Sequence, residues 1–167
     1  HWAVLGNAGA VAIKNIVYKI TEGDGSFQER GKVPAKVMSI DENFMLIKKT
    51  SNLCLSSDLN GFHFYGTDLC IIANILGYTS YVINFNLTHK SKGTANPEFY
   101  RIKEDLIRKY ERALKGRYVQ TCMTNFHISD SQFKNILFTS KPLMFFARQY
   151  FKILKYLSDG KNSGNIE

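Results

Sequence analysis

The sequence lacks any stretch of roughly 20 uncharged apolar residues, the length that a membrane-spanning helix needs. Its first residues also lack the basic, apolar and small-residue series of a secretory signal peptide. A disordered chain is excluded because 44% of the 167 residues are hydrophobic, enough to form one domain with a single core. Since the chain opens without Met on an apolar, strand-like run, we expect it to be the rear part of a longer protein.

Cysteine is scarce and widely spaced. The three cysteines, Cys54, Cys70 and Cys122, form no CxxC pair and no alternating Cys/His pattern. These absences exclude a zinc-binding motif and a disulfide scaffold. We expect three buried thiols in a reducing compartment, and therefore a cytoplasmic protein.

Positive charge is present in excess and is concentrated near the end of the chain. Residues 101–161 contain 13 Lys or Arg against 5 acids, which accounts for the whole net charge of +8. Such an asymmetry favours a partner with negative charge, namely a phosphate, a nucleic acid or an anionic membrane surface. A basic face that is merely solvated is the alternative.

Hydrophobic periodicity predicts a mixed α/β domain. The segments that read as strands are 2–5, 37–40, 44–48 and 78–87, and the helical ones are 68–77, 98–115 and 141–157. Residues 6–10 read as a small-residue turn and residues 21–36 as a loop or a polar hairpin. We expect segments 2–5, 44–48 and 81–87 to share one sheet, with the helix from Asp68 packed on its face.

The densest group of chemically capable side chains is Gly61-Phe-His63-Phe-Tyr65-Gly-Thr-Asp68-Leu-Cys, where a loop enters a helix. Asp68 alone reads as an N-cap or first-turn acid, because the positive end of a helix favours a carboxylate. The same position would keep it ionised, as a general base requires. His63 alone reads as a half-buried structural histidine.

The order of several motifs resembles the rear half of a family 2-like glycosyltransferase of the GT-A fold, the bacterial type that builds capsule or other surface polysaccharide. The motifs are Trp2-Ala-Val-Leu-Gly6-Asn-Ala-Gly9, Ile40-Asp41-Glu42, the Gly61 to Cys70 segment, Gly77-Tyr78 and the strand that ends at His89. The resemblance covers residues 2–125. It implies a mixed sheet flanked by helices and transfer of a hexosyl-type sugar by an inverting mechanism.

The resemblance also implies roles for individual residues. Asp68 would be the catalytic base, although the family usually has an acid where this chain has Gly66. His89 would be a metal ligand or a contact to the pyrophosphate. The acceptor and donor would be bound by Trp2, Gly6, Gly9, Asp41, Glu42, His63 and Tyr65. We expect Asp68 and His89 to face one cleft with residues 6–9.

The Asp-x-Asp motif with which this family holds a divalent cation occurs nowhere in the chain. The nearest approximation, Glu22-Gly23-Asp24, follows the Trp2 segment instead of preceding it. We therefore expect an acceptor-side portion whose N-terminal nucleotide-binding part is missing or truncated. Its implied partners are a nucleotide-sugar donor, a glycan or lipid-linked acceptor and Mg²⁺ or Mn²⁺. The alternatives are a noncatalytic sugar-binding remnant and a basic nucleic-acid-binding module, although nucleic acid is not the expected partner.

We expect three regions: a glycosyltransferase-like domain (1–125), a basic amphipathic helical extension (126–158) and a flexible tail (159–167). Within the extension, an apolar stripe that includes Phe146, Tyr150 and Ile153 is flanked by Arg148, Lys152 and Lys155. This helix either packs on the domain or lies at a membrane interface with its basic residues toward lipid headgroups. The second case would place the protein at the inner face of the membrane.

Overall fold

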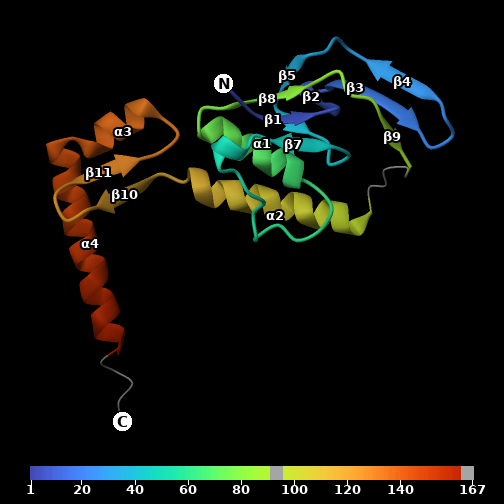
Figure 1. The fold of residues 1–167 in the computed structure, drawn as a ribbon. Coiled ribbons are helices and arrows are strands. Elements are labelled where there is room, and N and C mark those ends of the chain that lie inside the picture. Colours follow the sequence, from blue (N-terminus) through green and yellow to red (C-terminus); the bar gives the residue numbers. More distant parts are fainter. Residues whose placement is uncertain (91–95, 163–167) are drawn as a thin grey trace. The chain divides into compact units, whose positions relative to one another are not determined.

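The protein is described by a computed structural model that covers residues 1–90 and 96–162, with side chains described through residue 157. The chain divides into two compact units, unit 1 (His1–Lys109) and unit 2 (Tyr110–Glu167). Helix α2 (Pro97–Leu114) contains the boundary, whereas the sequence placed a boundary at residue 125. The architecture is mixed α/β, as predicted (Figure 1).

The first sheet of unit 1 has the strand order β5-β8-β1-β7. Its strands are β1 (Trp2–Gly6), β5 (Ala35–Val37), β7 (Met45–Ile47) and β8 (Thr79–Val82). β1 runs parallel to β8 and antiparallel to β7. Helix α1 (Tyr65–Ile75) packs against β1 and β8 and begins three residues before the predicted start at Asp68. The predicted sheet is confirmed for 2–5 and 44–48 and, of 81–87, for its first two residues.

The second sheet of unit 1 has the order β4-β3-β2-β6, with β9 paired to β3. Its strands are β2 (Ala8–Ala12), β3 (Asn15–Glu22), β4 (Phe27–Arg30), β6 (Ser39–Ile40) and β9 (Leu87–His89). β3 and β4 form an antiparallel hairpin whose turn and second strand lie in the segment 21–36, which was predicted as a loop or polar hairpin. The predicted turn over residues 6–10 is wrong, because β2 begins at Ala8.

Two strands predicted from the sequence are divided between the two sheets. Segment 37–40 is split between β5, which ends at Val37, and β6. Residues 78–87 were expected to run as one core strand, but β8 ends at Val82 and β9 begins at Leu87 in the other sheet. The break coincides with Asn84 and Asn86, which have poor strand propensity. The side-chain amide of Asn86 donates to Thr21 Oγ1 at 2.9 Å and fixes this crossing beside β3.

The core of unit 1 lies between the first sheet, β6 and α1. Its fully buried side chains include Val4, Ile40, Leu69 and Val82. A short 3₁₀ helix, η1 (Lys49–Ser51), follows β7. Gly77 has a φ of 79°, so the left-handed residue predicted after α1 is confirmed.

Unit 2 consists of a hairpin followed by two helices: β10 (Arg117–Gln120), β11 (Asn125–Ile128), α3 (Gln132–Thr139) and α4 (Lys141–Asn162). The expected helical extension from residue 126 therefore begins within a strand. The predicted helix over 141–157 is confirmed and continues to Asn162, into the segment expected to be a tail. Residues 163–167 of that tail lie outside the described residues.

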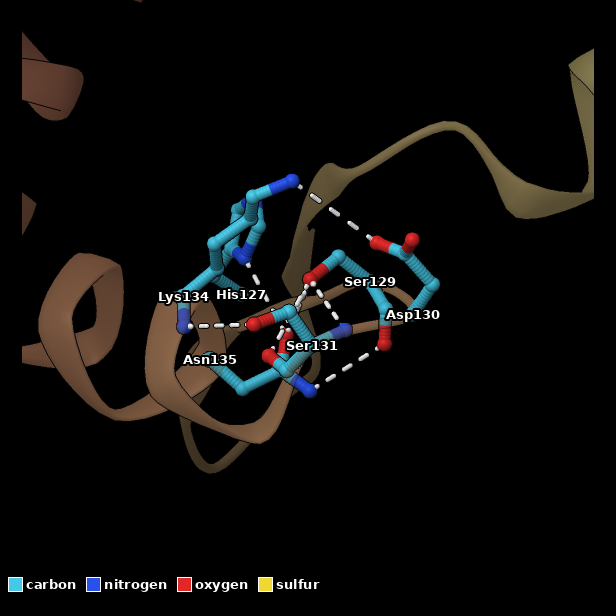
Figure 2. A network of polar contacts seen from close by, with 6 residues as sticks. All are labelled: His127, Ser129, Asp130, Ser131, Lys134 and Asn135. Carbon is cyan, nitrogen blue, oxygen red and sulfur yellow. Dashed lines mark hydrogen bonds and ion pairs between the residues drawn. The ribbon is translucent and has the colours of Figure 1, made fainter.

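A polar network fastens the start of α3 to β11 (Figure 2). Ser131 caps the helix by accepting a hydrogen bond from the Lys134 backbone N–H. Ser129 Oγ donates to Asn135 Oδ1 at 2.9 Å, and His127 Nδ1 lies 3.3 Å from the same oxygen. Because Ser129 and His127 share the Asn135 oxygen, this network positions α3 and does not align a nucleophile with a base.

The expectation of three buried thiols is wrong for two of them. Cys70 is buried in α1, whereas Cys54 and Cys122 are exposed. The apolar neighbours that suggested burial belong to a loop after η1 and to the β10–β11 turn, where side chains face water. Among the described residues, no helix has the length and apolarity needed to cross a membrane.

Candidate functional site

A cleft of about 440 Å³ opens in unit 1 where the second sheet meets the start of α1. Gly9, Tyr18, Glu22 and His89 line it from the strands, and Phe64 and Thr67 line it from the helix. Asp41 and Glu42, which directly follow β6, complete its acidic side. Among residues 1–90 and 96–162, those that line it include three carboxylates and one histidine but no Lys or Arg.

The Glu42 carboxylate lies at the N-terminal end of α1. Its Oε1 accepts a hydrogen bond from the backbone N–H of Gly66, in the first turn of α1, at 2.9 Å. Burial raises the pKa of the Glu42 carboxyl; the Gly66 hydrogen bond lowers it in part, and the charge of Asp41 raises it further. Burial, followed by the charges of Glu42 and Asp41, raises the pKa of Tyr65. Glu42 therefore binds its proton more tightly than an exposed glutamate does.

Gly66 leaves the space that the Glu42 carboxylate uses. A Cβ at residue 66 would lie 2.5 Å from the carbonyl oxygen of Ile40, 3.0 Å from Met45 Sδ and 3.1 Å from Glu42 Oε1. Any larger side chain here requires β6 to shift. The carboxylate beside the first turn of α1 therefore belongs to Glu42, which follows β6, and not to a residue of the helix at position 66.

His89 and Glu22 lie side by side on neighbouring strands. They are register partners in the parallel pair β3–β9, and His89 Nδ1 lies 3.8 Å from Glu22 Oε2. An imidazole nitrogen and a carboxylate oxygen, each about 2.1 Å from one ion, are at most about 4.2 Å apart, so this pair fits two ligands of a divalent cation. No group of three or more potential protein ligands occurs among the described residues, so water or substrate oxygens would supply the rest.

Asp68 lies in a different environment from the cleft. Its side chain is 1% exposed, and its Oδ1 is 2.8 Å from Lys109 Nζ on α2. Ser56 Oγ donates to its other oxygen. Burial opposes the charge of Lys109, but hydrogen bonds to Asp68 and Asp58 outweigh this and raise the pKa of the ammonium group.

Asp68 is a first-turn acid and not the N-cap, which is Phe64. It is not among the residues that line the described cleft. The structure therefore brings His89 together with Gly9, Asp41 and Glu42, and it separates these residues from the acid that the sequence favoured as the base.

The remaining expected site residues pack within unit 1. Trp2, on β1, has Lys48 Nζ 5.5 Å from its ring centroid. A Cβ at Gly6 would lie 2.5 Å from Ile40 Cγ2, so close packing of β1 against β6 requires this glycine. His63 contacts Phe99 edge to face, with centroids 5.3 Å apart. Of the residues expected to bind substrate, Gly9, Asp41 and Glu42 line the cleft, while Tyr65 stands beside Glu42.

Sequence reasoning did not assign Glu22 to the site. The signal was present, because Glu22-Gly23-Asp24 stood out as the nearest approach to an Asp-x-Asp motif. Its meaning depends on the pairing of β9 with β3, which joins residues far apart in the chain.

No family model matches the chain. It is 35% identical over 129 residues to a protein of Fuscovulum blasticum named "ATP synthase subunits region ORF 6". The matched region covers 74% of this chain and 51% of that protein, so the chain spans about half the length of this relative. The relative's name states no reaction and no substrate.

Proposed function

We propose that the chain is the acceptor-side part of a glycosyltransferase that moves a sugar from a nucleoside diphosphate sugar to a hydroxyl group of a glycan or lipid-linked acceptor. The observation that carries this proposal is the Glu42 carboxylate, held at the cleft by the Gly66 N–H at 2.9 Å. The motif order that resembles family 2-like glycosyltransferases supports it independently.

Glu42 is the proposed general base in place of Asp68. The acceptor hydroxyl gives its proton to Glu42 while its oxygen forms a bond to C1 of the donor sugar. The bond between C1 and the diphosphate oxygen breaks on the opposite side, and the diphosphate leaves with the electron pair. A carboxylate whose pKa is raised accepts a proton more readily near neutral pH, and such catalysis typically contributes about 10² to 10⁴ in rate.

The lining of the cleft suits the acceptor better than a bare diphosphate. Carboxylates accept hydrogen bonds from sugar hydroxyls, and the rings of Phe64 and Phe99 offer apolar faces for a sugar ring. The three carboxylates that line the described part of the cleft would repel phosphate. Glu22 and His89 are the residues that would hold a divalent cation, which when bound neutralises charge on the departing diphosphate.

Asp68 is proposed to act as a structural residue. Its buried ion pair with Lys109 ties the first turn of α1 to α2, and the same turn presents the Gly66 N–H to Glu42. Replacing Asp68 would therefore affect folding first and the orientation of Glu42 second.

A noncatalytic sugar-binding protein is the second candidate, favoured by Gly66, which stands where the resemblance expects an acid. Transfer assays with a panel of nucleotide sugars, acceptor sugars and Mn²⁺ separate the two functions. We expect Glu42→Gln to slow transfer by about 10² to 10⁴. Glu104→Gln, an exposed change on α2, should leave transfer intact. Acceptor binding by the wild-type protein without transfer from any donor in the panel would favour the second candidate.

A further inference from the structure

Unit 2 exposes an apolar stripe along α4. Phe146, Tyr150, Ile153 and Leu157 recur every three or four residues and are 65%, 59%, 58% and 57% exposed. Residues at this spacing share one side of a helix. A row of four large apolar side chains on one side of a helix is more than the isolated exposed residues that are normal on a protein surface.

The side chains that pack α4 against the β10–β11 hairpin are not those of the stripe. Met144 is 7% exposed, and the ring of Phe151 meets that of Tyr118 on β10 edge to face with centroids 6.2 Å apart. Met144 and Phe151 are two turns apart and share a different side of the helix from the stripe. The packing of α4 within unit 2 therefore leaves the stripe available to another surface.

Helix α3 adds apolar exposure of the same kind. Phe133 and Ile136, one turn apart, are 73% and 68% exposed. The contact between α3 and α4 belongs to unit 2 itself. Aromatic and aliphatic side chains are thus exposed on both helices.

The charge of this segment has one sign. Residues 131–157 contain no Asp or Glu, and their basic residues are Lys134, Lys141, Arg148, Lys152 and Lys155. The four basic residues of α4 up to Leu157 fall within about 60° of one another on the side of the helix opposite the stripe, because each residue advances by about 100°. An aromatic-rich apolar face opposite a basic face is typical of helices that lie in a membrane interface.

We propose that the α3–α4 segment docks unit 2 onto an anionic lipid bilayer, with the α4 stripe and Phe133 entering the interface. Charge complementarity decides between this occupant and a second copy of the chain. Residues 131–157 offer no acid that could form an ion pair across a seam between two copies, whereas helices that pair in solution normally carry charges of both signs beside their seam. An anionic leaflet attracts every basic residue of the segment within a Debye length.

The test is co-sedimentation of the full chain with vesicles of neutral phosphatidylcholine, or of the same lipid with about 30% phosphatidylglycerol. We expect binding to the anionic vesicles in about 0.1 M NaCl and loss of most of it in about 0.5 M NaCl. Equal binding to neutral vesicles, or no binding to anionic vesicles at low salt, would overturn the proposal.

Two double variants test the two faces separately. Phe146→Gln with Ile153→Gln, and Lys141→Gln with Lys152→Gln, should each weaken binding about tenfold or more. Lys32→Gln with Lys36→Gln removes the same charge from exposed positions of unit 1 and should leave binding unchanged. Circular dichroism checks that each variant is folded, and a charge-preserving change, Lys141→Arg with Lys152→Arg, should retain binding.

Other occupants of the stripe would give different results. Light scattering could reveal a dimer of the wild-type chain that Phe146→Gln with Ile153→Gln dissociates. If neither the wild type nor this variant bound vesicles, the occupant of the stripe would be a second copy of the chain. Salt-sensitive retention on an oligonucleotide without vesicle binding would show a nucleic-acid surface. Sugar transfer to a soluble acceptor does not depend on this surface, so failure here leaves the proposed function standing.

Discussion

Glu42 accepts a hydrogen bond at 2.9 Å from the backbone N–H of Gly66, which joins the exit of β6 to the first turn of α1. The bond satisfies one of the donors that a helix leaves free at its start. It also keeps a half-buried carboxylate at the edge of the cleft. One contact thus serves both the fold and the proposed chemistry.

Glu42→Gln should lower kcat for sugar transfer by about 10² to 10⁴, because glutamine retains the acceptor oxygen for Gly66 but cannot take a proton. In the wild-type protein, kcat should fall as the pH drops through the raised pKa of Glu42. A pH–rate profile with both proteins checks this. A variant that retains wild-type turnover would exclude Glu42 as the base.

The stability of the same variant should depend on pH in a defined direction. The pKa of Glu42 is raised above its ordinary value of 4.5, so its contribution to stability is fully present below that value and is lost as the pH rises through the folded-state pKa. Glu42→Gln should therefore be at least as stable as the wild type at pH 7, by thermal unfolding. The difference in stability between the variant and the wild type should shrink toward pH 4. A difference that grows on acidification would contradict a raised pKa for Glu42.

Gly66→Ala should destabilise unit 1 by about 1 to 3 kcal/mol, because the added methyl group would lie 2.5 Å from the Ile40 carbonyl oxygen. Gly23→Ala is the matched control, since its added Cβ would meet neighbours at 3.5 Å or more. Urea unfolding of both variants measures the difference. Equal stabilities would show that the start of α1 has room to move.

Asp68→Asn should cost about 3 kcal/mol, because it leaves the Lys109 ammonium group without its buried carboxylate while Asp58 remains at 3.1 Å. The pKa of Lys109 is raised, so the pair's contribution is fully present below pH 10.5 and is lost as the pH rises through the folded-state value. Chemical unfolding at neutral and alkaline pH checks both statements. A stable Asp68→Asn variant that has lost only turnover would instead make Asp68 the base.

Glu22→Gln combined with His89→Asn should weaken Mn²⁺ binding at least about tenfold, since two proposed ligands lose their donor strength. Electron paramagnetic resonance of free Mn²⁺ measures this without any transfer assay. Glu29→Gln, an exposed change on the neighbouring strand β4, serves as the control. Equal Mn²⁺ affinity in the double variant would place the cation elsewhere.

Hydrophobic spacing within short segments of the sequence predicted several helices and strands of the structure. The strand at Trp2, the helix entered near Asp68 and the amphipathic α2 all follow from hydrophobic spacing. The pairing of β1 with β8 in one sheet was also predictable, because a strand, a helix and another strand follow one another along the chain.

The arrangement of the site depended on contacts between distant parts of the chain. Asp68 carries a cap-like signal, but its partner Lys109 comes from another helix and turns a candidate base into half of a buried ion pair. Glu22 lies beside His89 only because the chain crosses after β8 to the second sheet, where β9 pairs with β3. Periodicity within a segment contains no information about either pairing.

The crossing from β8 to β9 couples the interior of unit 1 to its cleft. A single segment carries Val82, at the centre of the core, and His89, in the lining of the cleft. Opening of the first sheet would pull on the strand that carries His89, so the core and the cleft should lose hydrogen-exchange protection together. Ligand affinity would then report on core substitutions that touch no ligand.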